Sequence, residues 1–461
     1  MPRLRGHRHP RFRAQSTRTP ARRHAPGFRT RRADAGGGGR RLRRPARSGG
    51  GGRTRARRCA GRGVLGVHRR RLRRPGGRPP RRDPRATHAA SASPHRRTPP
   101  GPVSERGEPG FAAPGAGGLT VVTGATGFVG SHAVAELTRR GRRVRAFVRD
   151  TDRLARVLGA HGLDPAGLDS VAVGDVRDPR AVADAVADAD AVVHAAAVVA
   201  TDRTREEAVV ATNLAGTRHV LAAALDAGTR VVVHVSSAAA LFPFRSEIVT
   251  PDHPVGTARN AYARSKAACE AHVRRLQADG APVVSVYPSG VLGPDDPGPG
   301  ELTRAAAFWL TGFFPRSAAA TAAYVDVRDL AAVLAGAVER CSGPARYLAW
   351  GTHVTFRDQL EIMRRVTGRR LRSGPAPRPL MWAWGRLGDL ARRLGVDLVL
   401  TAEGYAYLFH FRPADQSATS RDLGVDFRPL ADTFADTFRW LHRVGLVDAG
   451  AIGRLADTPA S

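Results

Sequence analysis

Residues 123–130 read TGATGFVG, and this stretch places three glycines at a G-x-x-G-x-x-G spacing. A short apolar run, 119–122, comes before it, and an amphipathic stretch from Val129 to about Arg140 follows. In a strand–loop–helix context the first glycine permits a tight turn and the second lets the backbone approach a pyrophosphate. The third lets the helix pack closely on the strand. Free amides at the positive end of the helix then meet the phosphates. The stretch therefore predicts a dinucleotide-binding loop.

The same alternation of apolar runs and amphipathic stretches continues along the chain. Val-rich runs of strand length alternate with Ala- and Arg-rich stretches of helix length. This pattern predicts an α/β fold: a doubly wound parallel Rossmann sheet with helices on both faces and ligands at the carboxyl ends of the strands. The expected strands are 119–122, 143–148, 170–173, 191–194 and 231–235, and the expected helices are 129–140, 180–187, 204–227 and 262–278.

Four regions follow from this pattern. Residues 116–287 form the predicted NADP-binding Rossmann domain, and 321–348 return to it as a strand and helix. Residues 288–447 form a smaller C-terminal substrate domain, and 448–461 form a tail. Aromatic side chains of the substrate domain could bind a hydrophobic substrate or form the core of that domain. These side chains are Phe308, Trp309, Phe313, Phe314, Trp382 and Trp384.

An Arg-, Gly- and Pro-rich leader, residues 1–115, precedes the folded part. Residues 1–118 hold 33 arginines and only four acidic residues, which accounts for most of the formal net charge of +34. The leader has too little apolar surface to offset its ordering entropy, so we expect disorder. It is a nucleic-acid-binding tail, a solvated tail without a specific role, or the product of a mis-assigned start. The remainder is nearly neutral, so no nucleic-acid binding is expected through the folded part.

The end of the second predicted strand bears on the choice of cofactor. Arg149 follows this strand directly, and Arg153 comes four residues later. A guanidinium can bind the 2′-phosphate of NADP bidentately, whereas NAD sites place an acid on the ribose hydroxyls. Asp150 is the neighbouring residue and keeps NAD open. The sequence therefore favours NADP(H) over NAD(H).

Tyr262 and Lys266 form the candidate catalytic pair. Residues four apart share a helix face, so the phenol and the ammonium face the same space. A free phenol has a pKa of about 10, and a nearby cation stabilises the phenolate needed for proton transfer near neutral pH. Lys266 is the chain's one lysine among 74 basic residues. Ser237, just after the 231–235 strand, could hydrogen-bond a substrate carbonyl, and Ser236 is the second candidate.

Cysteine usage and hydropathy give weaker expectations. Cys59, Cys269 and Cys341 form no C-x-x-C pair, so we predict no metal or disulfide framework, and a reducing cytoplasmic location fits. No run of about 18 uncharged apolar residues occurs, so no transmembrane segment is expected. The N-terminus lacks the apolar region of a secretory signal.

Together these motifs resemble the extended short-chain dehydrogenases/reductases, also called the NAD-dependent epimerase/dehydratase superfamily, over about residues 118–445. Within it the sequence is most similar to the dihydroflavonol reductase and 3β-hydroxysteroid dehydrogenase-like group. The motifs are TGATGFVGSH at 123–132, GDVRD at 174–178, VVHAAA at 192–197, TNLAGTRHVL at 212–221, VSS at 235–237, YARSK at 262–266, YPSGVLGPDD at 287–296 and YVDVRDLA at 324–331.

The resemblance implies roles for individual residues. Tyr262 would be the acid/base, Lys266 would bind the nicotinamide ribose and tune the tyrosine, and Ser237 would orient the substrate. It also makes a homodimer plausible. The expected cofactor-binding residues are Thr123, Gly124, Thr126, Gly127, Phe128, Val129, Gly130, Arg149, Arg153, Asp175, Val176, Ala195, Ala196, Ala197, Asn213, Tyr262, Lys266, Pro288, Ser289 and Val291.

The predicted function is an NADP(H)-dependent oxidoreductase that transfers a hydride between nicotinamide and a small carbonyl or alcohol substrate. A nucleotide-sugar epimerase with tightly bound NAD is the alternative. A third reading is a catalytically silent nucleotide-binding or redox-sensing protein, or an RNA-associated protein working through its leader. Sugar-nucleotide 4,6-dehydratases carry an Asp-Glu pair after the catalytic hydroxyl, whereas Ala238-Ala239 follow Ser237. This departure argues against such a dehydratase.

Overall fold

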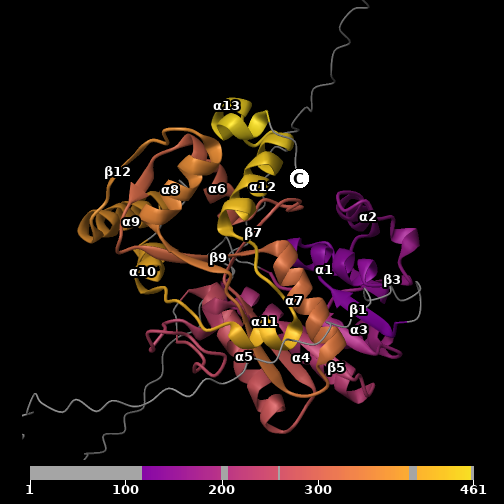
Figure 1. Cartoon of the computed structure of the whole chain (residues 1–461). Coiled ribbons are helices and arrows are strands. Elements are labelled where there is room, and N and C mark those ends of the chain that lie inside the picture. The colour runs from indigo at the N-terminus through magenta and orange to yellow at the C-terminus, as the bar shows by residue number, and fades with distance from the viewer. Residues whose placement is uncertain (1–116, 199–205, 258–259, 394–401, 458–461) are drawn as a thin grey trace, which may run out of the picture. The chain divides into compact units, whose positions relative to one another are not determined.

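A computed structural model describes residues 117–198, 206–257, 260–393 and 402–457 of the chain (Figure 1). The predicted disordered leader lies outside the described residues.

The central feature is a seven-stranded sheet in which every pair of neighbouring strands is parallel. Its order is β10-β6-β5-β4-β1-β2-β3. From β1 the chain runs outward through β2 and β3, then crosses back to β4 and continues through β5 and β6. The order therefore reverses between β1 and β4, which confirms the predicted doubly wound sheet and puts the ligand crevice at this switch point. The strands are β1 (Leu119–Thr123), β2 (Arg143–Val148), β3 (Ser170–Val173), β4 (Ala191–His194), β5 (Val231–Val235), β6 (Val283–Pro288) and β10 (Ala345–Ala349).

Helices cover both faces of this sheet because each central strand is apolar on both sides. Val121 and Val122 are successive residues of β1 and point to opposite faces, so each belongs to a different core cluster. The cluster around Val122 includes apolar side chains of α1, α2 and α7. The cluster around Val121 includes those of α3, α4 and α5. These helices are α1 (Phe128–Arg139), α2 (Thr151–Gly159), α3 (Pro179–Val186), α4 (Glu206–Asp226), α5 (Ala261–Ala278) and α7 (Val327–Arg340).

Among the described residues, one helix is long and apolar enough to cross a membrane by length and composition, and this is α4. Its Val220, Leu221 and Ala224 are buried in the core of the fold. The apolar character of α4 therefore has a structural explanation inside the protein.

A second lobe has its own core, built around Phe314, Phe434 and Phe438. Its three-stranded sheet has the order β11-β9-β7, and β12 pairs with β8. β9 belongs to this small sheet, whereas the following α7 packs against α1 and β10 extends the central sheet. The strands are β7 (Gly290–Leu292), β8 (Phe314–Arg316), β9 (Thr321–Asp326), β11 (Thr352–Thr355) and β12 (Ser373–Pro375).

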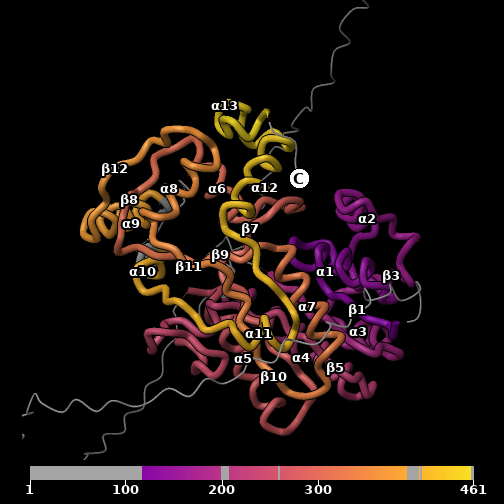
Figure 2. Tube along the Cα trace, in the orientation of Figure 1, coloured from indigo at the N-terminus to yellow at the C-terminus, as the bar shows by residue number. Residues whose placement is uncertain are grey.

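The C-terminal part of the chain contributes to both cores. Figure 2 shows the yellow segment running from α10 along α11 and on to α12. α11 packs against α7 and β10 beside the central sheet, while α12 packs against α8 in the second lobe. The remaining helices are η1 (Pro165–Gly167), η3 (Ala238–Leu241), α6 (Glu301–Thr311), α8 (Phe356–Thr367), α9 (Arg378–Arg393), α10 (Ala402–His410), α11 (Ser417–Leu423), α12 (Leu430–Arg443), α13 (Ala449–Ile452) and η4 (Gly453–Ala456).

Candidate active site

The glycine-rich loop joins β1 to α1, and two of its glycines have no tolerated replacement. Gly124 has a φ of +74°, and a Cβ there would lie 2.7 Å from the Ala196 amide nitrogen. A Cβ on Gly130 would collide with the carbonyl oxygen of Gly124. The Gly127 amide closes the turn by donating to that same oxygen (2.9 Å). The loop is thus a backbone cradle at the carboxyl end of β1.

The N-terminus of α1 is open toward this cradle. Gly127 is its N-cap and makes no side-chain capping bond, and no acidic residue stands in the first turn. The first amides of a 12-residue helix therefore remain without side-chain partners at its positive end, next to a backbone that only glycine permits. These features fit a pyrophosphate, with Thr126, Phe128 and Val129 half-buried around it.

The region after β2 brings Arg149 close to a carboxylate. Arg149 is 73% exposed, and its Nη1 lies 3.9 Å from Asp175 Oδ2. Asp150 caps α2 by accepting a hydrogen bond from the Arg153 amide (2.9 Å), and Arg153 itself is exposed. Asp150 therefore has a structural use that does not involve a ribose, and both arginines have the freedom to reach a ligand.

Asp175 and Val176 follow β3 and lie at the same edge of the sheet. Arg177 donates two hydrogen bonds to the Asp175 carboxylate (3.0 and 2.8 Å), and these lower the pKa of Asp175 to about 2. Val176 is half-buried against the core, and its carbonyl accepts from His219 (3.1 Å). The loop that the resemblance places at the adenine is therefore firmly held.

Several predicted cofactor residues at the end of β4 are tied into a polar network. Thr123 Oγ1 lies 2.9 Å from His194 Nδ1 and accepts from the Ala196 amide (3.4 Å). His194 Nε2 lies 3.2 Å from Thr217 Oγ1. The network fixes Ala195, Ala196 and Ala197 beside the glycine loop, so Thr123 acts here through its contacts with the protein.

Asn213 links the same strand end to α5. Its side chain accepts from the Val198 amide (2.8 Å) and donates to the Val198 carbonyl (2.9 Å) and to Ser265 Oγ (2.8 Å). Ser265 directly precedes Lys266, so Asn213 positions the helix that carries the candidate catalytic pair.

Two buried histidines lie beneath this network, and we expect them to make stability pH-dependent. Burial lowers the pKa of His194 to about 3, and burial together with His194 lowers the pKa of its stacked neighbour His234 well below the usual value. Unfolded histidine titrates near pH 6.5, so the unfolded state binds more protons below that pH. The free energy of unfolding is therefore highest above about pH 6.5. It falls as the pH is lowered toward 3, by up to about 1.4 kcal/mol per pH unit for each histidine.

His234→Leu isolates one of these groups. Both ring nitrogens of His234 are buried without a hydrogen-bond partner, which costs roughly 1–3 kcal/mol per unsatisfied group. We expect the variant to be at least as stable at pH 7.5 and to lose about 1.4 kcal/mol less than the native chain between pH 7.5 and 5.5. Urea unfolding at both pH values measures this, and identical losses in the two proteins would contradict it.

Ser237 and Lys266 lie near the end of β5, and α5 carries both Lys266 and Tyr262. The buried Lys266 Nζ donates to the Val235 carbonyl (2.9 Å), two residues before Ser237. Tyr262 lies one turn earlier on α5, half-buried. Ser237 Oγ accepts from the Ala239 amide (3.1 Å), which leaves its own hydroxyl hydrogen free to donate. The ammonium likewise retains two further N–H groups.

The structure separates the two candidate serines. Ser236 Oγ donates to Glu270 Oε2 (2.9 Å), within a buried cluster completed by Ser285, Tyr287 and Arg274. The Glu270 carboxylate is fully buried and also accepts from the Tyr287 hydroxyl (2.6 Å) and Arg274 Nε (2.9 Å). Ser236 therefore belongs to the core, and Ser237 remains the candidate catalytic serine. The sequence did not indicate this cluster, because its members come from three separate segments: the end of β5, α5 and β6.

The end of β6 closes another side of the site. Pro288 is buried, and Ser289 donates through its amide to the Ala349 carbonyl (3.1 Å) and through Oγ to the Trp350 carbonyl (2.7 Å). Val291 lies on β7, half-buried. These contacts tie the predicted nicotinamide border to β10.

An aromatic cluster of Phe242, Phe244, Trp350, Tyr407 and Phe411 lies next to this centre. Ring centroids are 4.7 Å apart for Phe242 and Tyr407, and 5.1 Å apart for Tyr407 and Phe411. Burial raises the pKa of Tyr407, and the nearby Tyr262 adds to the shift. Phe242 directly follows the η3 turn that Ser237 caps. No local pattern in the sequence indicates this cluster, because its residues are spread over 170 positions.

The aromatic residues predicted for the substrate domain lie elsewhere. Phe314 is fully buried, and Trp309 packs edge-on against it, so these two form core. Phe308, Phe313 and Trp382 are exposed. Of the two roles expected for these aromatic residues, substrate binding or domain core, Trp309 and Phe314 have the core role.

Comparison with known proteins identifies the family. A sequence model of the NAD dependent epimerase/dehydratase family matches residues 120–346. Sterol demethylase protein B of Methylococcus capsulatus is 30% identical over 341 residues, covering 71% of this chain and 99% of that protein. The chain belongs to this family. The predicted resemblance is thereby confirmed, as is the expected class, a nicotinamide-dependent oxidoreductase acting on CH–OH groups.

Two further similarities agree with this assignment. A putative dihydroflavonol 4-reductase of Synechocystis is 28% identical over 341 residues, covering 71% of this chain and 95% of that protein. The crystal structure of gox2253 superposes with a TM-score of 0.59 at 27% identity, covering 72% of this chain and 99% of that one. Both similarities extend over the two lobes of the described fold.

Proposed function

We propose that this family member is an NADP(H)-dependent oxidoreductase that interconverts a carbonyl and an alcohol on a small apolar substrate, with Tyr262 as general acid/base. The observation that supports it most strongly is the contact of Lys266 with the Val235 carbonyl at the carboxyl end of β5, two residues before Ser237. Tyr262 lies one turn before Lys266 on α5, and the glycine loop of the same sheet fits a pyrophosphate. A bound nicotinamide cofactor would supply or accept the hydride.

Three side chains divide the remaining work in this proposal. Ser237 donates a hydrogen bond to the substrate oxygen through the hydroxyl hydrogen that its contact with Ala239 leaves free. Tyr262 delivers a proton to that oxygen during reduction and removes it during oxidation. Lys266 stabilises the phenolate form and offers its remaining N–H groups to the cofactor ribose. Asn213 keeps the helix in register through Ser265.

The aromatic cluster supports an apolar substrate. Phe242 and Tyr407 are half-buried and in ring contact, Tyr407 lies near Tyr262, and Phe242 ends the η3 turn that Ser237 caps. Together they could offer an apolar wall to a substrate. Two relatives carry the words sterol and dihydroflavonol in their names, and both words denote compounds with several fused or linked rings. The buried cysteines Cys269 and Cys341, which are free thiols, fit the predicted cytoplasmic location.

The test of this proposal is turnover with NADPH and NADH against ketones, aldehydes, steroids and nucleotide sugars. A reductase consumes one NADPH per carbonyl reduced. A nucleotide-sugar epimerase would purify with NAD bound and turn over without added nucleotide. If the protein purifies with NAD bound and epimerises a nucleotide sugar, it is an epimerase and the proposed reductase function is wrong.

Arg149→Ser tests the NADP preference. Removing an exposed guanidinium that binds the 2′-phosphate should raise the KM for NADPH roughly tenfold and change the KM for NADH little. A tenfold change is the lower end of what a charge-assisted hydrogen bond contributes. Arg156→Ser is the matched control, because Arg156 is also exposed and lies on the neighbouring α2. Equal effects of Arg149→Ser on the two cofactors would remove Arg149 from the cofactor site.

A further inference from the structure

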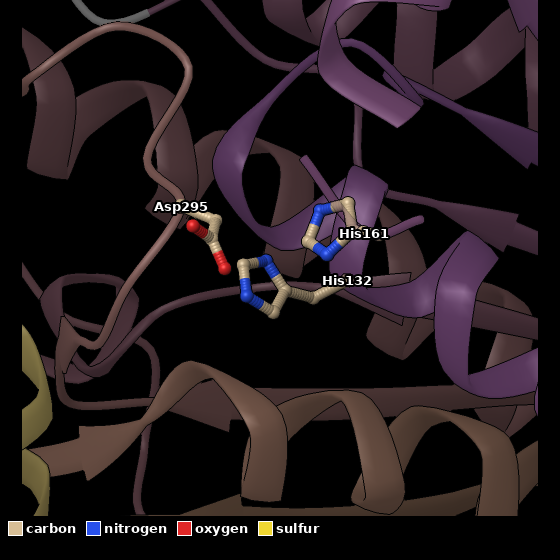
Figure 3. Close-up of side chains that lie close together, drawn as sticks. All are labelled: His132, His161 and Asp295. Carbon is tan, nitrogen blue, oxygen red and sulfur yellow. The ribbon is translucent and has the colours of Figure 1, made fainter. Parts of the chain in front are cut away.

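Three side chains from distant parts of the chain meet beside α1. His132 lies on α1, His161 follows α2, and Asp295 follows β7. One potential ligand atom from each lies within 4.8 Å of the other two. Figure 3 shows the Asp295 carboxylate directed at the His132 ring. The His161 ring lies on the opposite side of the His132 ring from Asp295. The two imidazoles are in edge contact, with centroids 4.4 Å apart.

The hydrogen bonding of the two histidines leaves nitrogen lone pairs for a ligand. His132 Nδ1 lies 3.0 Å from the Phe128 carbonyl. A carbonyl only accepts, so Nδ1 carries the proton and Nε2 keeps its lone pair. Metal-bound histidines characteristically donate their other ring N–H to such a carbonyl. His161 Nε2 is buried and has no hydrogen-bond partner, which is costly unless something binds it.

Asp295 is held in an uncommon backbone conformation. Its φ of 60° makes it the one non-glycine residue with positive φ in the described part of the chain. The neighbouring Asp296 anchors the loop by accepting from Thr303 Oγ1 (2.6 Å) and from the Gly298 amide (3.1 Å). Arg443 approaches Asp295 Oδ1 only to 3.4 Å and is 63% exposed, so the carboxylate has no strong partner.

The surroundings permit a cation to enter and remain. The nearby Arg328 is paired with Asp326 and Asp436, which offsets its charge. A surface cavity of about 290 Å³ borders Asp295 and is also lined by Arg328 and Arg443, whereas His132 and His161 do not line it. Its lining residues include neither Ser237, Tyr262 nor Lys266.

We propose that His132, His161 and Asp295 form a binding site for a divalent transition-metal ion such as Zn²⁺. Two imidazoles and a carboxylate suit this class of ion, with water completing the coordination. Tetrahedral bonds of about 2.1 Å put ligand atoms roughly 3.4 Å apart, so small side-chain rotations complete the site. The ion would join α1, whose first residues form the cofactor cradle, to the loop that leads from β7 into α6.

The test uses the full chain, stripped with EDTA and dialysed, and the variants His161→Ala and Asp295→Asn. Asparagine has the shape of aspartate and tolerates positive φ, so Asp295→Asn should keep the fold, and equal Tm values in EDTA check this. His272→Ala is the matched control, because His272 is a half-buried histidine outside the cluster. The chain has 16 histidines in total, so only differences between proteins count.

Calorimetry should show one equivalent of Zn²⁺ bound by the native chain and by His272→Ala. The two cluster variants should lack this equivalent or bind it at least about 10- to 100-fold more weakly. Co²⁺ should give visible d–d absorption, and Zn²⁺ should raise the Tm, in the same two proteins only. Equal binding of Zn²⁺ by all four proteins, or retention of the extra equivalent in either cluster variant, would overturn the assignment.

Discussion

Tyr262→Phe is expected to lower kcat on the order of 10²–10⁴-fold, the usual contribution of a positioned general acid/base. The substitution removes only the phenolic oxygen, and the ring remains on α5 one turn from Lys266. Neither the glycine cradle nor the hydrogen bond from Lys266 to the Val235 carbonyl involves the phenolic oxygen of Tyr262. Cofactor affinity should therefore stay within about twofold, since no cofactor contact of the cradle is lost.

The measurement is steady-state turnover with NADPH together with a fluorescence titration of cofactor binding. The matched control is Tyr407→Phe, which removes the hydroxyl of the neighbouring aromatic residue and leaves the same half-buried ring. We expect a much smaller loss of kcat in this control. Full activity in Tyr262→Phe, or an equal loss in both variants, would remove Tyr262 from the acid/base role.

Glu270→Ala is expected to destabilise the folded state by about 3–5 kcal/mol, the cost of breaking a buried charge pair by removing one partner. The carboxylate is fully buried and accepts hydrogen bonds from Ser236, Tyr287 and Arg274. Its loss leaves Arg274 Nε and the Tyr287 hydroxyl hydrogen without their acceptor, although Arg274 Nη2 can still donate to the Tyr287 oxygen. Because Ser236 is next to Ser237, activity should fall in parallel.

Urea unfolding at pH 7 measures the effect. Glu270→Gln retains acceptors and shape, so it should lose less stability than the alanine variant. Glu361→Ala serves as the surface control, since this glutamate pairs with Arg364 on an exposed helix face and is 62% exposed. We expect it to cost about 0.5 kcal/mol or less. A Glu270→Ala effect no larger than this would show that the cluster contributes little to stability.

Much of the first lobe was predictable because its signals are local. The strands expected at 143–148, 170–173, 191–194 and 231–235 match β2 to β5 to the residue. β2, β4 and β5 are short Val-rich runs that are largely buried, and the edge strand β3 has the same kind of sequence although it is only half-buried. Such a pattern needs no information from distant residues. The glycine loop was equally predictable, since Gly124 needs positive φ and Gly130 meets the loop's own backbone.

The second lobe was predicted less well because its elements depend on distant partners. The strand expected near residue 322 was assigned to the first domain by its position before a helix. β9 instead pairs with β7 and β11, and neither of those three- and four-residue strands has a pattern of its own. Likewise, no local signal distinguished the aromatic residues that became core, such as Phe314, from those beside Tyr262, such as Phe242 and Tyr407.

The sequence by itself determined the family, the doubly wound sheet and the pairing of Tyr262 with Lys266, because these depend on spacings within one loop, one strand or one helix turn. Only the tertiary structure decided that Ser236 is tied into the core through Glu270. It alone brought Glu270 into a buried cluster and His132, His161 and Asp295 together. The physical reason is that such contacts join residues up to 163 positions apart, and their proximity exists only once the sheet and its helices have packed.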